Sequence, residues 1–316
     1  MDDKTKTEAA ETLRFGAEDF VITGAKGLMI ERNIRPGVNY WSDAWRRLRK
    51  NPSAMGALGL IVIIAVLAII GPHLRGYDFV TMAPQYRNQP PQARFWFGAD
   101  NLGRDLFSRV WYSARVSILI SLVCTLIQMI FGSIYGGIMA YKGGVVDNVM
   151  MKLIVVLTSM PSLLIIILVM IALGNNITGM MAALCVSAWC ETARQVRGQL
   201  LQLKNLEYVT ASKALGGRSA WMIRKHLLPN TIGVLILNAA VSAPGYIFME
   251  STLSFLGIGL QAPYISLGTL IAAGQQTMDF HPYQLFFPAL VLCLTVLAVN
   301  LFGDGLRDAL DPRLRV

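Results

Sequence analysis

Long windows without a charged residue constrain this chain more than any other feature. A helix rises only about 1.5 Å per residue, so crossing the hydrocarbon of a bilayer takes about 20 apolar residues. Charged side chains inside that layer are costly and rare. The uncharged windows cover residues 54–71, 116–141, 153–190, 228–249 and 283–303. The sequence therefore predicts an all-α integral membrane protein.

The composition agrees with this class and excludes an ordinary soluble domain. Only 15% of the residues are charged and 54% are hydrophobic, whereas soluble domains carry about 25% charged residues. The net charge of +9 does not by itself indicate nucleic acid, because basic residues gather on the cytoplasmic side of membrane proteins. The first residues, MDDKTKTEAAETLRF, lack the features of a cleaved signal peptide. We therefore expect a cytoplasmic N-terminus, a lipid environment and no nucleic-acid partner.

The window at residues 153–190 is too long for one crossing. The sequence GNNITG at residues 174–179 is typical of a tight turn, so we expect a span on each side of it. The second of these helices is expected to continue past Glu191. The prediction is therefore six transmembrane helices, with both termini on the same, cytoplasmic side. Three of these spans contain a proline, which kinks a helix: Pro161, Pro244 and Pro288.

Residues 251–278 are also uncharged, but four glycines and Pro263 interrupt them. Unpaired backbone groups cost several kcal/mol each in hydrocarbon. We expect a loop with short helices on the outer face rather than a seventh span.

Lys and Arg residues near the span ends predict the orientation. Residues 41–50 place four basic side chains just before the first span, with Trp41, Trp45 and Leu48 on one side of a short interfacial helix. The segment between spans four and five is also basic, whereas residues 251–284 carry no Lys or Arg. We expect the basic segment to be cytoplasmic, although five arginines in residues 73–111 weaken the pattern.

That cytoplasmic segment has the signals of a short helix. Asn205 can cap its start, Glu207 lies in its first turn, and Gly216 with Gly217 offers a left-handed exit. A helix of about ten residues is unstable alone in water. The segment therefore requires a partner surface.

The same segment resembles the EAA signature of binding-protein-dependent ABC importer permeases. The segment begins at Glu207, and its matching residues are Ala211 and Gly216, followed by Leu228 and Pro229. Thr210 stands where the signature usually has glutamate, and Ser212 where it usually has its second alanine. The resemblance implies a coupling helix at residues 205–217 that docks on an ATPase subunit.

Three further segments resemble the C-type permease of the oligopeptide and dipeptide branch of that family, which also includes nickel permeases. They are FGADNLGRDLFSR at 97–109, ESTLSFLGIG at 250–259 and GDGLRDALDP at 303–312. The resemblance implies a type I ABC importer permease in the bacterial cytoplasmic membrane. It also implies a second permease subunit, two ATPase subunits and an extracytoplasmic peptide-binding protein as partners.

This resemblance divides the chain into four regions. Residues 1–53 are expected to form a cytoplasmic segment with the interfacial helix, and residues 54–112 the first span and an external loop. Residues 113–304 are expected to form the permease core and residues 305–316 a cytoplasmic tail. Peptide import is the expected function, with nickel or glutathione import in the same family as alternatives.

Nothing in the sequence indicates catalysis by this chain. It contains no G-x-x-x-x-G-K-[ST] phosphate loop, H-E-x-x-H or G-x-S-x-G motif, so we expect neither an enzyme nor a bound cofactor. His73 and His281 stand alone, and no cysteine pair has metal-ligand spacing.

An ion-coupled secondary transporter would place ionisable groups in the middle of its spans, and the middle of each predicted span is uncharged. Glu250, Pro244 and Glu191 are candidate pathway or gate residues. For Glu250, a membrane-edge group that pairs locally or meets water is the favoured alternative. For Glu191, the favoured alternative is a structural pair with Arg194 three residues on.

Overall fold

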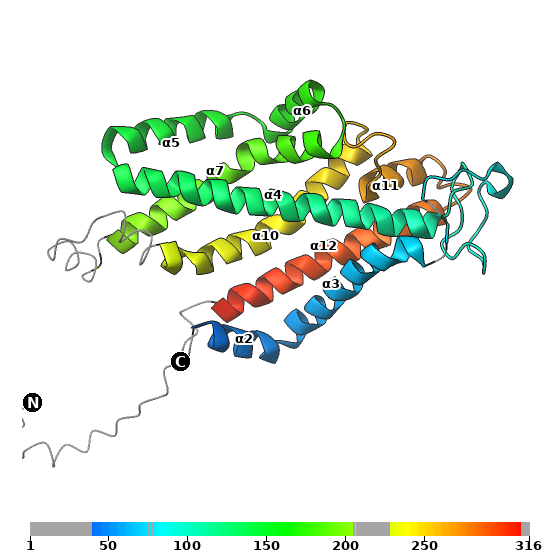
Figure 1. Cartoon of the computed structure of the whole chain (residues 1–316), viewed down its shortest axis with the longest axis horizontal. Helices are drawn as coiled ribbons and strands as arrows, with labels where there is room; N and C mark the ends of the chain where they lie inside the picture. Colours follow the sequence, from blue (N-terminus) through cyan, green and yellow to red (C-terminus); the bar gives the residue numbers. More distant parts are fainter. Residues whose placement is uncertain (1–39, 75, 78, 205, 207–227, 311–316) are drawn as a thin grey trace, which may run out of the picture. The chain divides into compact units, whose positions relative to one another are not determined.

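The computed structural model describes residues 40–310, apart from residues 75, 78, 205 and 207–227. The chain divides into two units, residues 1–43 and residues 44–316. Figure 1 shows that the described part of the chain is built from helices joined by loops. Within the described ranges, the β-type pairing is a single isolated bridge between Ala99 and Asp105.

The α-helices differ widely in length, and two short 3-10 turns accompany them. The α-helices are α2 (Tyr40–Lys50), α3 (Pro52–Ile70), α4 (Leu106–Lys142), α5 (Gly144–Ser159), α6 (Ser162–Leu173), α7 (Ile177–Lys204), α10 (Leu228–Phe255), α11 (Leu267–Gln275) and α12 (Tyr283–Leu310). The 3-10 turns are η2 (Gly71–His73) and η3 (Pro84–Tyr86).

Four helical segments are long and apolar enough to cross a bilayer. They are Pro52–His73, Leu106–Lys142, Thr231–Phe255 and Tyr283–Leu310. The pair α5 and α6 passes the same test as one span, bent by 87° at its break. Helix α7 is 28 residues long, but its second half, ETARQVRGQLLQLK, is polar. The described part thus has four or five candidate spans, and six crossings remain a prediction.

The predicted windows lie inside helices of the structure. The window at 54–71 lies in α3 and η2, the window at 116–141 lies in α4, and α12 begins at Tyr283 as expected. The turn between Leu173 and Ile177 confirms the break at GNNITG, and α7 continues past Glu191 as predicted.

Two boundaries differ from the expectation. The third span was expected to begin after Lys152, but its helix starts at Gly144. The carboxylate of Asp147 is accommodated there because Arg197 of α7 donates two hydrogen bonds to it. The fifth was expected to end near Met249, but α10 runs on to Phe255. Hydrogen bonds from serine side chains hold Glu250 inside that helix.

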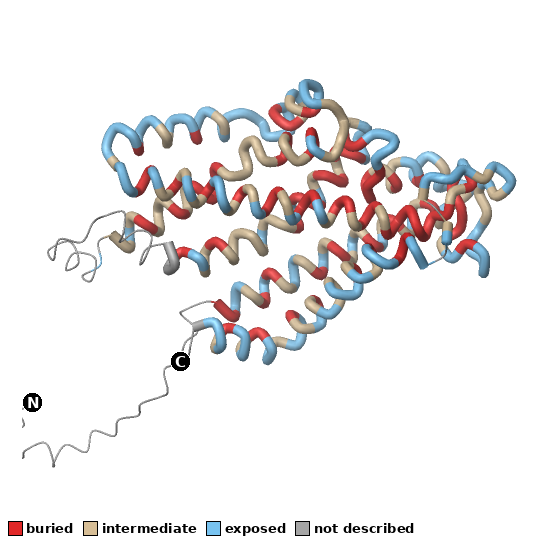
Figure 2. The backbone as a smooth tube through the Cα atoms, in the orientation of Figure 1, coloured by how far each residue is buried: buried red, intermediate tan, exposed pale blue. Residues whose placement is uncertain are grey.

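The long helices pack with α4 at the centre. Helix α4 contacts α7, α10 and α3, and α12 contacts α3, α10 and α11. Figure 2 shows buried residues where these helices face one another and exposed residues on their outer sides. The apolar core includes Ile120, Met180 and Leu253, which are fully buried.

Small residues allow α4 and α7 to approach closely. A Cβ added at Gly132 would meet the Thr192 side chain at 2.6 Å, and one added at Gly136 would meet the Ala193 backbone. Because lipid tails give no hydrophobic drive between helices, such close van der Waals contact is a main source of their association.

Helix α2 confirms the predicted helix before the first span. Leu48 is buried, and Trp45 is half exposed. Asn51 caps the start of α3 by accepting a hydrogen bond from the Ala54 amide at 3.3 Å, with Pro52 in the first helical turn.

Candidate functional site

The predicted coupling residues lie mostly beyond the part of the chain that the structure describes. Glu207, Thr210, Ala211, Ser212 and Gly216 belong to the undescribed residues 207–227. Leu228 and Pro229 are the first residues of α10, where a proline fits because first-turn amides have no helical partner. The segment connects the end of α7 at Lys204 with the start of α10.

Glu250 lies in a buried cluster of serine hydroxyls. The Ser117 hydroxyl of α4 donates to its Oε2 at 2.7 Å, and the Ser254 hydroxyl donates to its Oε1 at 2.9 Å. Ser251 contributes a longer bond of 3.4 Å to Oε2. Glu250 and Ser266 both have no exposed surface. The carboxylate therefore joins α4 to the last turns of α10.

Glycines bring the start of α11 against the same cluster. A Cβ at Gly268 would meet the Ser251 backbone, and one at Gly259 would meet Ser254. Ser266 caps α11 in a reciprocal capping box with Thr269. The segment 250–259 is thus a packed corner, in which Glu250 pairs locally and does not meet water.

A second polar cluster joins three helices around Gln128. Its amide nitrogen donates to Thr192 of α7 at 2.8 Å and to Ser242 of α10 at 3.2 Å. The Tyr246 hydroxyl donates to its amide oxygen at 2.7 Å. Sequence reasoning missed Gln128, although it is the only side-chain amide in the window 116–141.

Pro244 is buried inside α10. A proline has no amide hydrogen, so the Ala240 carbonyl one turn earlier loses its usual helical donor. A Cβ built at Gly303 of α12 would lie 3.1 Å from that carbonyl oxygen, and Ser121 of α4 donates to the Ala243 carbonyl at 2.6 Å. Pro244 therefore lies where α10 meets both α4 and α12.

Glu191 lies on the exposed side of α7. Arg194 donates to its Oε2 at 2.8 Å, and Gln195 donates to its Oε1 at 3.1 Å. The expected pair with Arg194 is confirmed, and the two side chains are 60% and 39% exposed. Such an exposed pair contributes little to stability.

A stronger ion pair links α5 to α7. The Nε and Nη2 atoms of Arg197 donate to the two carboxylate oxygens of Asp147, each at 2.5 Å. This two-point geometry is the one that arginine and carboxylate favour. Sequence reasoning did not find this pair, because fifty positions separate its members.

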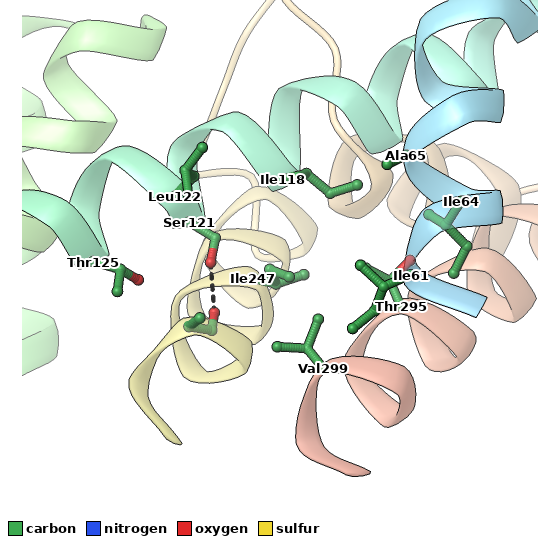
Figure 3. Close-up of a pocket in the computed structure, with 11 residues that line it drawn as sticks. Ile61, Ile64, Ala65, Ile118, Ser121, Leu122, Thr125, Ile247, Thr295 and Val299 are labelled. Carbon is green, nitrogen blue, oxygen red and sulfur yellow. Dashed lines mark hydrogen bonds between the residues drawn. The ribbon is translucent and has the colours of Figure 1, made fainter. Parts of the chain in front are cut away.

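An apolar cavity of about 180 Å³ lies between α3, α4, α10 and α12. Figure 3 shows Ile61 and Ile64 of α3 facing Ile118 of α4, Ile247 of α10 and Val299 of α12. The Thr125 hydroxyl at its edge is buried and has no hydrogen-bond partner among the described residues. The cavity could hold an apolar group, but it has few polar side chains that could orient a polar ligand.

The segment 97–109 folds as a cap on the start of α4. Asp105 accepts hydrogen bonds from the Ser108 amide and hydroxyl at 2.8 and 2.7 Å. Asp100 accepts from the Arg104 side chain at 2.7 Å, and Arg109 donates to the Phe79 carbonyl at 2.9 Å. Gly103 adopts φ +76° beside Ala83. The polar residues of segment 97–109 therefore stabilise this loop and the start of α4.

Metal-ligating side chains do not gather anywhere in the described ranges: no group of three or more His, Cys, Asp or Glu could hold an ion. The four cysteines are free thiols, of which Cys124 and Cys190 are buried.

The geometry is that of a helical bundle with several candidate membrane spans. Long apolar helices pack through glycines and buried hydrogen bonds, and Glu250 and Pro244 lie where these helices meet. A chain from the structure titled "Inward facing conformations of the MetNI methionine ABC transporter" superposes with a TM-score of 0.50 at 18% identity, covering 65% of this chain and 95% of that one. This chain therefore shares its fold with that chain of an ABC transporter structure.

Family models make the assignment specific. The model "Binding-protein-dependent transport system inner membrane component" matches residues 128–316, and "N-terminal TM domain of oligopeptide transport permease C" matches residues 39–91. The chain belongs to the family of binding-protein-dependent transport system inner membrane components.

Curated relatives are similar along nearly their whole length. The dipeptide transport system permease protein DppC of Bacillus subtilis is 46% identical over 94% of this chain and 93% of its own length. The oligopeptide transport system permease protein OppC of the same organism is 41% identical over 90% and 93%. OppC of Escherichia coli is 38% identical over 88% and 93%.

Proposed function

We propose that this chain is the C-type permease subunit of an ATP-driven importer that moves peptides across the bacterial cytoplasmic membrane. The observation that carries the proposal is the similarity to dipeptide and oligopeptide permeases over about nine-tenths of the chain. The apolar helices agree with an inner-membrane component. The substrate class comes from the names of those relatives.

The chain would work as one part of an assembly. It has no phosphate-binding loop, so ATP hydrolysis falls to two separate ATPase subunits. A second, related permease would supply the other half of the pathway, and an extracytoplasmic binding protein would deliver the peptide. Six crossings would place both termini and the segment 205–217 in the cytoplasm.

The coupling helix is proposed for residues 205–217, with Glu207, Thr210, Ala211, Ser212 and Gly216 at the ATPase contact. The segment follows the polar end of α7 and precedes the apolar α10, which supports a position at the membrane edge. Motion of an ATPase there would act directly on both helices. Leu228 and Pro229 would mark the return into the bilayer.

Purification of the complex with Gly216→Asp tests this assignment. The substitution places a side chain that disfavours a left-handed exit at the proposed contact. We expect normal membrane insertion and retention of the second permease, with loss of the ATPase subunits and of ATP-dependent uptake. Gln202→Asp, in the last turn of α7, is the matched control, because it adds a carboxylate near the same segment but outside residues 205–217. ATPase retention with normal uptake in Gly216→Asp would refute the coupling assignment.

A further inference from the structure

Gln128 joins three helices in the middle of a candidate membrane span. It stands at the midpoint of the uncharged window 116–141 and is 5% exposed. Its amide nitrogen donates to Thr192 of α7 and to Ser242 of α10, and its amide oxygen accepts from Tyr246 of α10. Both hydrogens and the oxygen of one amide are therefore used, and they link α4 to two other helices. We call these four residues the amide network.

An apolar side chain would fill this position at lower cost. Moving an amide from water into an apolar environment is unfavourable, and hydrogen bonds between membrane helices are individually weak. Leucine would occupy a similar volume without that cost. What an amide supplies instead is direction, because its donors and its acceptor lie in one plane and each bond fixes the position of its partner. The residue type at position 128 therefore indicates a role in positioning helices.

The α7 side of the network is closely packed. Thr192 is 1% exposed. Gly132, one turn after Gln128, lies so close to α7 that an added Cβ would be 2.6 Å from the Thr192 side chain. Gly136, one turn further along, makes the same kind of contact with the Ala193 backbone. Helices α4 and α7 therefore form one closely packed unit at this level.

The α10 side of the network differs, because it includes a break in the helix. Ser242 and Tyr246 lie two residues before and two residues after Pro244, which lacks the amide hydrogen of a regular helix. Ile247, three residues after the proline, lines the apolar cavity between α10 and its neighbours, as Figure 3 shows. The hydrogen bonds from Gln128 therefore hold α10 to α4 on both sides of the proline, at a place where packing is incomplete.

Helices α7 and α10 are the two that flank the segment 205–217, where an ATPase subunit is proposed to bind. Helix α7 ends at Lys204, and α10 begins at Leu228. A displacement of that segment therefore enters the bundle through both helices. If the two helices were not linked, the break at Pro244 would let α10 bend without moving α7.

We propose that Gln128 is a positioning residue for the coupling of ATP hydrolysis to peptide transport. Through the amide network it holds α7 and α10 in a fixed relation to α4, so that displacement of the segment 205–217 moves both helices together. This role requires no contact with peptide or nucleotide. The inference rests on the proposed function, because it takes the coupling segment as its starting point.

The ratio of ATP hydrolysed to peptide imported measures this role. Complete complexes in proteoliposomes are compared for Gln128→Leu, which removes all three bonds, and for Thr192→Val, which removes only the bond to α7 and keeps a similar shape. One hydrogen bond between membrane helices changes an equilibrium by about threefold. We therefore expect the ratio to rise by about threefold or more in both variants, while ATP hydrolysis is retained.

Ser121→Ala is the matched control. It removes a hydrogen bond from α4 to the Ala243 carbonyl of α10 but leaves the link between α7 and α10 intact. We expect a lower melting temperature with an unchanged ratio. If Gln128→Leu does not assemble, the double variant Ser242→Ala with Tyr246→Phe removes the two α10 bonds with a smaller change of shape, and the same rise in the ratio is expected.

Two results would overturn the proposal. An unchanged ratio in Gln128→Leu and Thr192→Val, with lowered melting temperatures, would show that the network only stabilises the fold. An equal rise in Ser121→Ala would show that loss of any bond between these helices uncouples transport. Uptake by the unsubstituted complex separates the two claims. With normal uptake by that complex, either result defeats only the role of Gln128, whereas absence of ATP-dependent peptide uptake defeats the proposed function.

Discussion

The hydroxyl of Ser117 in α4 donates a 2.7 Å hydrogen bond to the carboxylate of Glu250 in α10. The two residues are 133 positions apart, and both are buried. Ser254 donates to the other carboxylate oxygen at 2.9 Å. One acidic side chain thus fixes the end of α10 against α4.

Removing the Glu250 carboxylate is expected to destabilise the protein. In Glu250→Ala, the Ser117 and Ser254 hydroxyls lose their common acceptor, and each buried unsatisfied polar group costs about 1–3 kcal/mol. Glu250→Gln keeps one acceptor oxygen and is expected to lose less. Thermal melting in detergent measures the difference. Equal melting temperatures for Glu250→Ala and the unchanged protein would show that the cluster does not stabilise the fold.

Adjacent glycines in α4 offer a matched pair of substitutions. A Cβ at Gly136 would meet the Ala193 backbone and the Val196 side chain, whereas one at Gly137 would meet nothing within 4 Å. We expect Gly136→Val to separate α4 from α7 and to lower the yield of folded protein, with a loss of about 1–3 kcal/mol from overpacking. Gly137→Val is expected to fold normally. Size-exclusion profiles and melting curves compare the two, and indistinguishable variants would contradict the close contact.

The Asp147–Arg197 pair predicts a rescue by charge exchange. Asp147→Asn leaves the Arg197 guanidinium without its two-point acceptor and is expected to lower the free energy of unfolding by about 1–3 kcal/mol. Because the Arg197 side chain is 27% exposed, solvent reduces this loss. The double variant Asp147→Arg with Arg197→Asp should recover part of that loss. A double-mutant cycle on melting temperatures measures the interaction. Additive effects, with no recovery, would mean that the two side chains act independently.

Two hydroxyls near the apolar cavity should respond in opposite directions. Thr125 has a buried hydroxyl with no hydrogen-bond partner in the described part of the chain. The similarly shaped Thr125→Val is therefore expected to be neutral or to stabilise the protein by up to about 1 kcal/mol. Ser121 donates to the Ala243 carbonyl at 2.6 Å, so Ser121→Ala is expected to destabilise. The melting temperatures of the two variants are compared with that of the unchanged protein. A clearly lower melting temperature for Thr125→Val would mean that the Thr125 hydroxyl has a hydrogen-bond partner in the membrane.

Hydropathy predicted most of the long helices, because every segment that crosses a bilayer as a helix needs about 20 apolar residues. The windows at 54–71 and 116–141 lie within α3 with η2 and within α4, and the turn at GNNITG is in place. The sequence pattern could not predict how sharply Pro161 bends its span. A proline removes a hydrogen bond, but it does not fix the bend angle of 87° or the packing of α6 against α7.

The inter-helix bonds were beyond sequence reasoning for a different reason. Gln128 and Asp147 look like isolated polar residues until the fold brings Thr192 and Arg197 beside them. Glu250 was expected near a span end, yet its burial depends on Ser117 and on Gly268 of another segment. Hydropathy depends on single positions, whereas these clusters depend on which helices are neighbours.

Uptake of labelled peptide by the reconstituted complex tests the central claim most directly. The complex that co-purifies with this chain is placed in vesicles. The binding protein and the labelled peptide are added on one side of the membrane, and ATP is supplied on the other side, where the ATPase subunits lie and peptide is expected to accumulate. We predict that peptide accumulates only when ATP, the ATPase subunits and this chain are all present. Accumulation that persists without the ATPase subunits, or a complete complex that hydrolyses ATP but moves no di- or oligopeptide, would contradict the account.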